Sequence, residues 1–389
     1  MTDSSQAPPP SAPETSFTYQ VPGFRRDDGF RTGPPPAIAP LVPEPHFPLR
    51  LLLDGEALVE NWRWLERQSA GAACGAAVKA DGYALGAREV VTRLANAGCR
   101  DFFVATWREA EALLPWLGAG SVSVLHGLAG EDLPHAAGSP ARPVLNTPRQ
   151  VERWKQGGQG RPCDVMIDTG INRLGLSAAQ VGEGLLDGLD IDILMSHLAC
   201  ADEDDAMNAR QLAAFAEVAA RVPAKRRSLA NSAGICLGGE YAFDLTRPGL
   251  ALYGGVPRRE AAGHIRQVVR IEAQVIQRRR VEAGGSVGYN GTWTAQAPAE
   301  IAVLNLGYAD GFLRGFSGTG RARLPVGYAP VVGRVSMDLT AILVDEAPQL
   351  REGDWVEVDF ALPTASAQSG LSQYELLTTL GRRHERVWK

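Results

Sequence analysis

Short apolar runs recur along the middle of the chain, and segments with helical spacing lie between them. A strand expected at Leu51–Leu53 is followed by Glu56–Arg67, in which apolar residues fall on one face of a helix. Eight more apolar runs follow at intervals of about 20 to 40 residues. They are residues 76–78, 102–104, 122–125, 143–145, 165–167, 191–195, 228–230 and 250–252. Parallel strands joined by crossover helices have this period, so we predict an eight-stranded (β/α) barrel over residues 49–257.

The pattern changes after Gly255. Apolar and polar residues alternate in 268–275, 301–306 and 355–360, and Gly and Pro turns separate these segments. Alternation with period two is typical of an antiparallel sheet. We therefore predict that residues 258–389 form a mainly antiparallel β domain with one short helix near its end, at Tyr374–Leu380. The expected fold class is α/β plus β.

The first 48 residues differ from both domains in composition. They contain 12 of the 26 prolines of the chain, including two runs of three. Proline removes a backbone donor and fixes φ, so it disfavours helices and central strands. We expect residues 1–48 to be a flexible extension, and we expect the functional residues to lie in the two domains that follow.

The composition of the chain limits the kinds of molecule that it is expected to bind. The net charge is −5 and the pI is about 5.8, and the chain has no long basic stripe, which argues against nucleic acid or an anionic membrane surface. The five cysteines form no CxxC pair, so neither a disulfide framework nor a metal site is indicated. No signal peptide and no run of about 18 apolar residues is found. A cytoplasmic protein that binds a small molecule is expected.

The active site of a (β/α) barrel lies at the C-terminal ends of its strands. Lys79 ends the first apolar run, and burial there would lower the pKa of its amine and favour a nucleophile suited to Schiff-base chemistry. A lysine that simply reaches solvent is equally compatible with this position. Arg173 follows the fifth run, where its planar guanidinium could bind a carboxylate or form a surface ion pair.

The last strands add further candidates. His197 follows the sixth run, although a single histidine at a strand end is more often structural. Asn231–Gly234 follows the seventh run and Arg247–Leu250 lies in the region of the eighth, where barrels commonly bind phosphate, but the first of these segments also fits a plain turn. Together with Lys79 they describe a pocket for pyridoxal phosphate.

Seven segments of the chain carry a resemblance to a known family. They are residues 77–83, 168–174, 231–233, 247–254, 287–292, 307–311 and 332–338, and they follow the family order. From about Leu51 to its C-terminus the chain resembles alanine racemase, a pyridoxal-phosphate enzyme of fold type III. The resemblance implies pyridoxal 5'-phosphate as cofactor, a small amino acid as substrate, and a homodimer in which the barrel of one chain faces the β domain of the other.

The resemblance also implies roles for individual residues. Lys79 matches the lysine that holds the cofactor and acts as one catalytic base, and Tyr289 matches the opposite base, which the partner chain contributes. The cofactor-binding positions correspond to Lys79, Tyr83, His197, Ser232, Arg247, Gly249, Leu250 and Tyr374. The substrate-binding positions correspond to Arg173, Tyr308 and Met337, and supporting positions correspond to Arg314 and Asp338.

The family pattern explains the choice of reaction. Tyrosine titrates near pH 10, so Tyr289 needs help from its neighbours to act as a base. His197 and Arg247 match a hydrogen-bonded pair in which the arginine faces the pyridine nitrogen. Because an arginine keeps its proton, the ring is a weaker electron sink, which favours racemisation over transamination.

One position departs from the family pattern. Many members carry a carbamylated lysine two residues before the Asp of the Asp-Thr-Gly segment, where it orients the arginine that binds substrate. This chain has Met166 there. We therefore expect no carbamylated lysine, and Arg173 must be held by another group.

Interconversion of L-alanine and D-alanine, which supplies D-alanine for peptidoglycan, is the leading hypothesis. A racemase of broader range that accepts serine, and a decarboxylase of the same fold type, are alternatives. A pyridoxal-phosphate carrier without catalytic activity is a further alternative, but it would not need the β domain with Tyr289.

Overall fold

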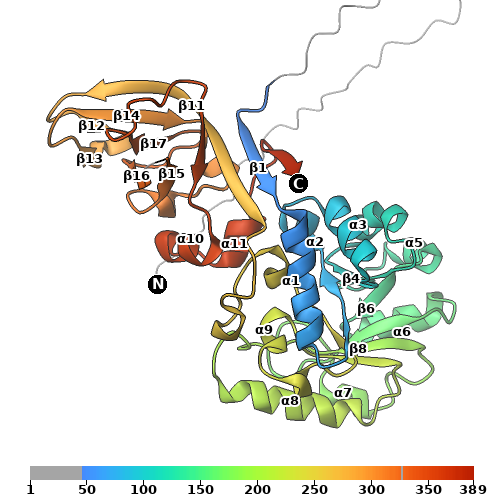
Figure 1. Cartoon of the computed structure of the whole chain (residues 1–389). Coiled ribbons are helices and arrows are strands. Elements are labelled where there is room, and N and C mark those ends of the chain that lie inside the picture. Colours follow the sequence, from blue (N-terminus) through green and yellow to red (C-terminus); the bar gives the residue numbers. More distant parts are fainter. Residues whose placement is uncertain (1–45, 326) are drawn as a thin grey trace, which may run out of the picture. The chain divides into compact units, whose positions relative to one another are not determined.

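The computed structural model describes residues 46–325 and 327–389 (Figure 1). The extension expected over residues 1–48 falls almost wholly outside the described residues. Within them, the chain forms a parallel barrel of strands and helices and a largely antiparallel β domain. The predicted fold class is confirmed.

Seven of the eight predicted barrel strands form one parallel sheet in chain order. The strands are β3 (Ala76–Ala77), β4 (Asp101–Val104), β5 (Ser121–Val124), β6 (Arg142–Leu145), β7 (Cys163–Met166), β8 (Ile191–Met195) and β9 (Arg226–Ser228). Most of their residues are buried, as expected for a sheet that side chains and helices cover on both faces.

The eighth strand was predicted at the wrong position. Residues Leu250–Tyr253 form a 3-10 turn, whereas the strand is β10 (Leu245–Thr246), which pairs with β2 (Ala73–Cys74). Backbone bonds from Arg247 N to Ala230 O (2.8 Å) and from Gly75 N to Thr246 O (2.9 Å) close the barrel on either side of β10. A short buried apolar run does not distinguish a strand from a turn, and that ambiguity caused the error.

The helices between the barrel strands follow the predicted spacing. The first is α1 (Gly55–Gln68), whose N-terminus is capped by Asp54 through a 2.8 Å bond from the N–H of Ala57. Its buried face includes Leu58, Trp62 and Leu65. The other helices of the barrel are α2 (Lys79–Tyr83), α3 (Ala87–Ala97), α4 (Trp107–Leu113), α5 (Leu133–Gly138), α6 (Pro148–Gly157), α7 (Ala178–Gly182), α8 (Ala206–Ala219) and α9 (Ser232–Ile235).

The β domain is built on one eight-stranded sheet, in the order β14-β17-β16-β15-β18-β11-β1-β19 with an additional pairing of β14 with β11. Its strands are β1 (Leu49–Leu53), β11 (Val269–Val281), β14 (Ala299–Leu304), β15 (Arg321–Leu324), β16 (Gly327–Val332), β17 (Thr340–Leu343), β18 (Trp355–Val358) and β19 (Glu385–Trp388). A separate hairpin joins β12 (Ser286–Val287) to β13 (Trp293–Thr294). Two helices follow β18, the unpredicted α10 (Leu362–Ser369) and the expected α11 (Gln373–Thr378).

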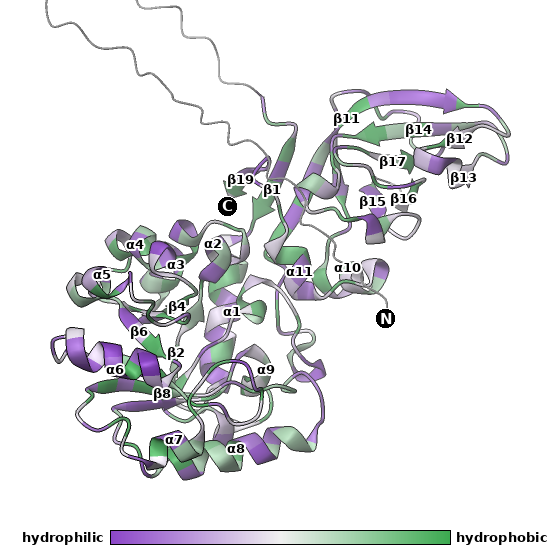
Figure 2. Ribbon diagram, turned by 180° about the vertical axis from the view of Figure 1, so that it is seen from behind, coloured by the Kyte–Doolittle hydropathy of each residue, from purple (hydrophilic) through white to green (hydrophobic). Residues whose placement is uncertain are grey.

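Strand β1 lies in this sheet, although the sequence placed residue 49 at the start of the barrel domain. It pairs antiparallel with β11 and parallel with β19. Strand β11 is buried at alternate positions in its first half and is polar in its second half, where Gln277 is followed by three arginines. Figure 2 shows this change of hydropathy along the strand.

Three phenylalanines form the aromatic core of the β domain. Phe312 and Phe316 are stacked with ring centroids 4.2 Å apart, and Phe360 lies 6.3 Å from Phe316. The first two side chains are completely buried and the third almost so. Aromatic side chains of this size contribute strongly to a core.

We expect Phe316→Ala to destabilise the protein by about 3–5 kcal/mol, because it removes a buried ring and leaves a cavity. Thermal unfolding followed by circular dichroism should show a midpoint lowered by roughly 10 °C. Ile276→Ala is the matched control, since that side chain is 45% exposed, and it should leave the midpoint nearly unchanged. Equal effects of the two substitutions would contradict this account of the core.

Candidate functional site

A cavity of about 530 Å³ opens at the C-terminal ends of the barrel strands. Nine of the residues to which the family resemblance assigns a binding or catalytic role line it: Lys79, Tyr83, Arg173, His197, Ser232, Arg247, Gly249, Leu250 and Tyr374. All but Tyr374, which belongs to α11, come from the segments that follow barrel strands. The prediction that chemistry gathers at this edge of the barrel therefore agrees with the geometry.

Lys79 begins a left-handed turn directly after β3. Ala80, Asp81 and Gly82 have φ values of 54°, 54° and 61°. Non-glycine residues rarely adopt this conformation, so it must be stabilised by its surroundings. At Gly82 a Cβ atom would lie 3.0 Å from the backbone of Ala87, so glycine is needed there.

Glu109, which the sequence analysis did not identify, stabilises this turn. One of its carboxylate oxygens accepts the N–H of Ala80 at 2.7 Å, and the other accepts the N–H groups of Ala105 and Thr106. The Thr106-x-x-Glu109 spacing is a recognisable capping box at the start of α4. The bond to Ala80, 29 residues away, has no signal in the sequence.

The surroundings of Lys79 favour its neutral form. Burial lowers the pKa of its amine, and the positive charge of Arg173 lowers it further, whereas Glu109 acts in the opposite direction. A neutral amine is the nucleophilic form of lysine.

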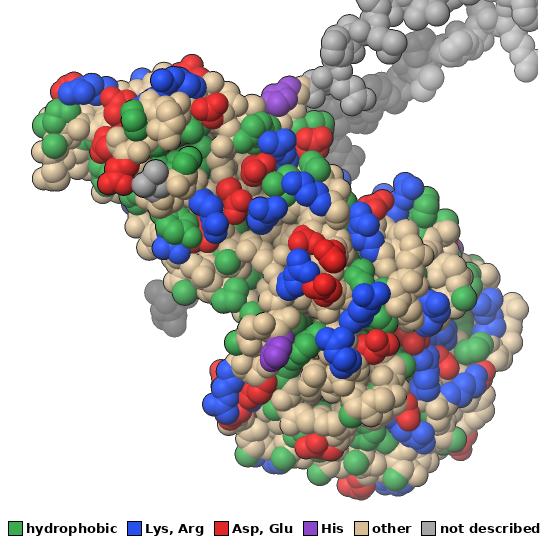
Figure 3. Space-filling view, viewed as in Figure 1, with side chains coloured by type: hydrophobic (Ala, Val, Ile, Leu, Met, Phe, Trp, Pro, Cys, Tyr) green, Lys and Arg blue, Asp and Glu red, His purple; other side chains and the backbone are tan. Residues whose placement is uncertain are grey.

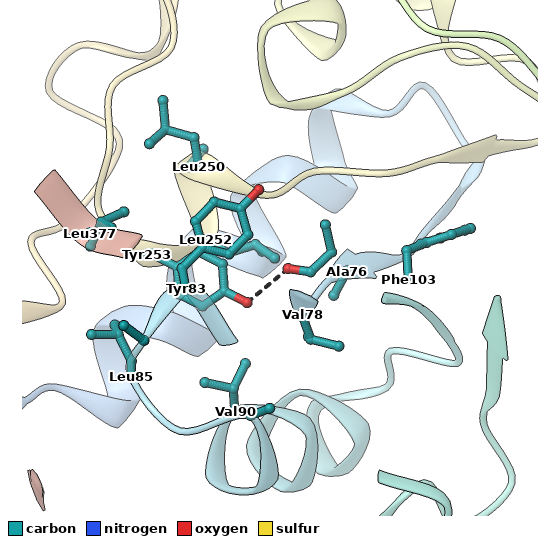
Figure 4. Packing of buried hydrophobic residues seen from close by; sticks show 14 of the residues in the cluster. Ala76, Val78, Tyr83, Leu85, Val90, Phe103, Leu250, Leu252, Tyr253 and Leu377 are labelled. Carbon is teal, nitrogen blue, oxygen red and sulfur yellow. Dashed lines mark hydrogen bonds between the residues drawn. The ribbon is translucent and has the colours of Figure 1, made fainter. Parts of the chain in front are cut away.

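Two tyrosines stack beside the lysine turn. The rings of Tyr83 and Tyr253 lie 4.5 Å apart, and the Tyr253 hydroxyl donates to the carbonyl of Ala77 at 2.8 Å (Figure 4). The ring centre of Tyr374, in α11, lies 6.4 Å from that of Tyr83. Burial raises the pKa of Tyr83 and of Tyr374, so their hydroxyls stay protonated and can donate hydrogen bonds.

Ser232 joins the loops that follow the last two barrel strands. Its hydroxyl accepts the N–H groups of Gly249 at 2.9 Å and Ala251 at 3.2 Å. A Cβ atom at Gly249 would clash with the Tyr83 hydroxyl, so the glycine leaves the space in which that hydroxyl lies. The result is a small polar recess bounded by Ser232, Tyr83 and backbone.

Arg247 lies on the cavity floor and is buried. It donates to the hydroxyl of Ser228 and to the carbonyl of Ser196 at 2.5 Å. The resemblance implied a hydrogen bond from Arg247 to His197, but these two described residues make none. The guanidinium reaches instead to the ends of β8 and β9.

His197 is neutral in this setting. Burial and the positive charges of Arg247, Arg173 and Lys79 lower its pKa to about 3. Gln211 of α8, another residue that the sequence analysis missed, donates to the carbonyl of His197 at 3.0 Å and to the hydroxyl of Thr169 at 3.2 Å.

Met166 lines the cavity where the family pattern has lysine. Arg173 is mainly exposed, on a loop that Asp168 shapes by accepting the N–H groups of Gly170 and Asn172 at 2.8 and 3.1 Å. The expected interaction partner of Arg173 is not identified among the hydrogen bonds and ion pairs of the described residues.

Tyr289, Tyr308, Arg314, Met337 and Asp338 do not line this cavity. All five belong to the β domain, where Tyr289 is 67% and Met337 is 53% exposed. The guanidinium carbon of Arg314 lies 5.2 Å from the centre of the Tyr308 ring, so the structure pairs it with this tyrosine. Tyr289 borders a second hollow of about 470 Å³.

The loops that carry these residues are held together. The N–H groups of Tyr308 and Ala309 donate to Ser336 and Met337 at 3.0 Å. Arg383, which the sequence did not single out, binds Asp338 at 2.7 Å and the buried Asp310 of the neighbouring loop at 2.7 and 2.9 Å. Tyr308, Met337 and Asp338 therefore belong to one ordered surface.

The cavity combines three chemical elements. A lysine with a lowered pKa can attack an aldehyde, arginines can bind anionic groups, and the recess at Ser232 and Tyr83 can accept phosphate oxygens. None of the helices in residues 46–325 and 327–389 has the length and apolar character needed to cross a membrane. On the face shown in Figure 3, acidic and basic side chains are interspersed.

Two family profiles match nearly all of the described chain. "Alanine racemase, N-terminal domain" matches residues 53–257, and "Alanine racemase, C-terminal domain" matches residues 268–388. The boundary between the two matches falls close to the change of pattern seen after Gly255.

Individual relatives agree with the profiles. The alanine racemase of Methylobacterium nodulans is 42% identical over 353 residues, which cover 87% of this chain and 95% of that protein. The crystal structure of alanine racemase from Bartonella henselae with covalently bound pyridoxal phosphate is 34% identical, with a TM-score of 0.83 over 89% of this chain and 100% of that one. The biosynthetic alanine racemase of Pseudomonas aeruginosa is 30% identical, with a TM-score of 0.81 over 88% of this chain and 100% of that one.

The electrostatic setting of Lys79 gives a prediction for the protein without cofactor. Arg173→Met should raise the pKa of the lysine amine, because it removes a like charge, and Glu109→Gln should lower it, because it removes an opposite charge. The pH dependence of amine acylation at Lys79, followed by peptide mass spectrometry, measures both shifts. Shifts of the same sign would show that the two substitutions act by disturbing the turn rather than by charge.

Proposed function

This chain belongs to the alanine racemase family, and we propose from this membership that it interconverts L-alanine and D-alanine with pyridoxal 5'-phosphate as cofactor. The single observation that carries the proposal is the meeting of Lys79, Arg247 and the Ser232 recess in one cavity. It unites a nucleophilic amine, a fixed cation and a site for phosphate oxygens.

The residues present fit this cofactor. Lys79 would hold it covalently through the amine, while the recess bounded by Ser232, Tyr83, Gly249 and Tyr374 would receive its phosphate. Glycine at residue 249 is required by the close approach of the Tyr83 hydroxyl, which keeps the recess open. When bound, the cofactor supplies an electron sink that makes the Cα proton of the amino acid acidic.

Arg247 would face the ring nitrogen of the cofactor. It keeps its own proton and donates from a position fixed by Ser196 and Ser228. An arginine gives the ring less electron-withdrawing power than a protonated nitrogen would, and this favours return of the proton to Cα. His197, which is neutral and half-buried, adds no second positive charge beside Arg247.

Two bases on opposite faces of the substrate complete the mechanism. Lys79 moves the proton at Cα on one face, and Tyr289 of a second copy moves it on the other. A single base would return the proton to the side from which it came. Arg173 orients the substrate carboxylate, and Tyr308 and Met337 of the second copy border the entrance.

The exposure of the β-domain residues supports a homodimer with shared sites. Tyr289, Met337 and Leu339 are large side chains that are 67%, 53% and 38% exposed in a single chain. Exposed aromatic and apolar residues in one area are typical of a surface that another protein covers. A symmetric dimer would bring Tyr289 of each chain to the cavity of the other.

The product would be D-alanine for peptidoglycan, made in the cytoplasm. A catalyst of broader range, which also accepts serine, is the second candidate on the same geometry. Tyr289 and Arg247 support racemisation over decarboxylation. A carrier protein without catalytic activity would not need the exposed surface around Tyr289.

We expect the protein with added pyridoxal phosphate to exchange the Cα proton of L-alanine in D2O and to form D-alanine. Lys79→Ala should abolish both, because it removes the attachment point and one base. Proton NMR with a chiral assay of the product measures exchange and inversion separately. L-serine in place of alanine tests the broader-range candidate, and exchange with neither amino acid would refute the proposal.

Mixing two inactive variants tests the shared site. Lys79→Ala and Tyr289→Phe should each be strongly impaired alone. After exchange of subunits, a mixed dimer has one site with both bases, so activity should recover to about a quarter of the wild-type value if subunits mix freely. No recovery, with mixed dimers verified by native mass spectrometry, would mean that both bases come from one chain.

A further inference from the structure

A network of charged side chains lies at the start of the barrel strands, where the side chains of Arg226 and Asp192 are 28% and 17% exposed. It consists of Asp101, Arg142, Asp164, Asp192 and Arg226, from β4, β6, β7, β8 and β9, and we call it the charge ring. Barrel interiors are usually packed with branched aliphatic side chains. Ionisable groups are costly to bury, above all the fully buried Asp164, so this network calls for an explanation.

The ring is continuous. Arg226 binds both oxygens of Asp101 at 2.9 Å, across the barrel from β9 to β4, and binds Asp192 at 2.8 Å. Arg142 links Asp192 at 3.1 Å to Asp164 at 3.2 Å. Three carboxylates therefore share two guanidinium groups, and an ionised ring carries one net negative charge.

Asp164 is the completely buried member. Its carboxylate accepts the hydroxyl of Ser123 at 2.6 Å, the backbone N–H of Ile193 at 3.1 Å and the guanidinium of Arg142. Burial raises the pKa of this carboxyl, while Arg142 and Ser123 act to lower it. The short bond from Ser123 is typical of an ionised acceptor.

The ring lies one layer below the cavity. Alternate residues of a strand point to the same side. Two residues beyond Asp101 and Asp164 on their strands are Phe103 and Met166, which line the cavity. Two residues beyond Arg226 is Ser228, which accepts a hydrogen bond from Arg247.

The cavity itself lacks negative charge. Besides Arg247, the titratable side chains that line it are Lys79, Tyr83, His126, Arg173, His197 and Tyr374, and no carboxylate of the described chain is among them. Arg247 donates only to neutral acceptors. Burial lowers the pKa of its guanidinium to about 10, and Asp164 is the carboxylate that opposes this effect.

We propose that the charge ring, through Asp164, is the counter-charge of Arg247 and sets the electrostatic potential at the cavity floor. This inference rests on the proposed function, in which Arg247 faces the cofactor ring. Asp164 is a positioning residue: it touches neither cofactor nor substrate and acts through Arg247. A negative charge below the floor stabilises the protonated form of the cationic groups above it.

The test is a pH titration of the absorption spectrum of the holoenzyme, which reports the protonation of the lysine-bound cofactor. Asp164→Asn keeps the shape of the side chain and removes its charge. The midpoint of this titration should fall by an amount on the order of one pH unit, as expected when one buried charge near the titrating group is removed. If Asp164 is uncharged in the native protein, the midpoint will not move, and the inference is wrong.

A double variant separates charge from shape. Asp164→Asn combined with Arg142→Gln removes both partners and leaves the net charge of the ring at one negative, so the midpoint should return to within about 0.3 units of the wild-type value. A midpoint as low as that of the single variant would show that disturbed packing, not charge, causes the shift.

If the Asp164→Asn variant does not fold, Asp192→Asn provides a second test of the same inference. The Asp192 side chain is 17% exposed, so solvent screens it and its removal should lower the midpoint by a smaller amount. An unchanged midpoint would count against the inference. Racemisation and cofactor binding by the wild-type protein are measured in parallel, so that a failure of the proposed function is recognised separately.

Discussion

The concentration of positive charge in one cavity is the constraint on which the rest of the structure depends. The positive charges of Arg247, Arg173 and Lys79 all lower the pKa of His197, and no carboxylate of the described residues lines their cavity. Such an arrangement is unfavourable in an empty pocket and favourable once anions enter it. A cofactor phosphate and a substrate carboxylate are the anions that this cavity fits. The cation-rich wall therefore serves binding more than folding.

The order of strands and the position of the cavity could be predicted because they follow local patterns. Apolar runs at regular intervals give parallel strands, and the residue after each run lies at the active edge. Lys79, His197 and Ser232 were found in this way. The eighth strand was misplaced because Leu250–Tyr253 is as apolar and as buried as a strand, although it is a turn.

Contacts between distant segments had no signal in the sequence. Glu109 has the spacing of a helix cap, and its second bond, to the turn of Lys79, depends on how β3 and β4 lie side by side. The same holds for the bonds of Arg247, which depend on where β8 and β9 end. In the sequence, Asp164 and Arg142 have no feature that distinguishes them from other charged residues. Only the folded barrel places them next to each other. The roles proposed for Tyr289 and Met337 would involve a second chain, whose position no pattern within one chain can predict.

Strand β1 links the two domains in a way that the chain order conceals. It pairs with β11 and β19 in the sheet of the β domain, and Asp54 directly after it caps α1 of the barrel. At the other end of the described chain, the N–H of Lys389 donates to the carbonyl of Leu53, and the carbonyl of Lys389 accepts the N–H of Gly55. The polypeptide thus passes between the domains twice, once through residues 53–55 and once after residue 257. A barrel excised at residue 55 would leave β11 and β19 without the strand that joins them, so neither domain is a self-contained piece that can be cut from the chain at a single linker.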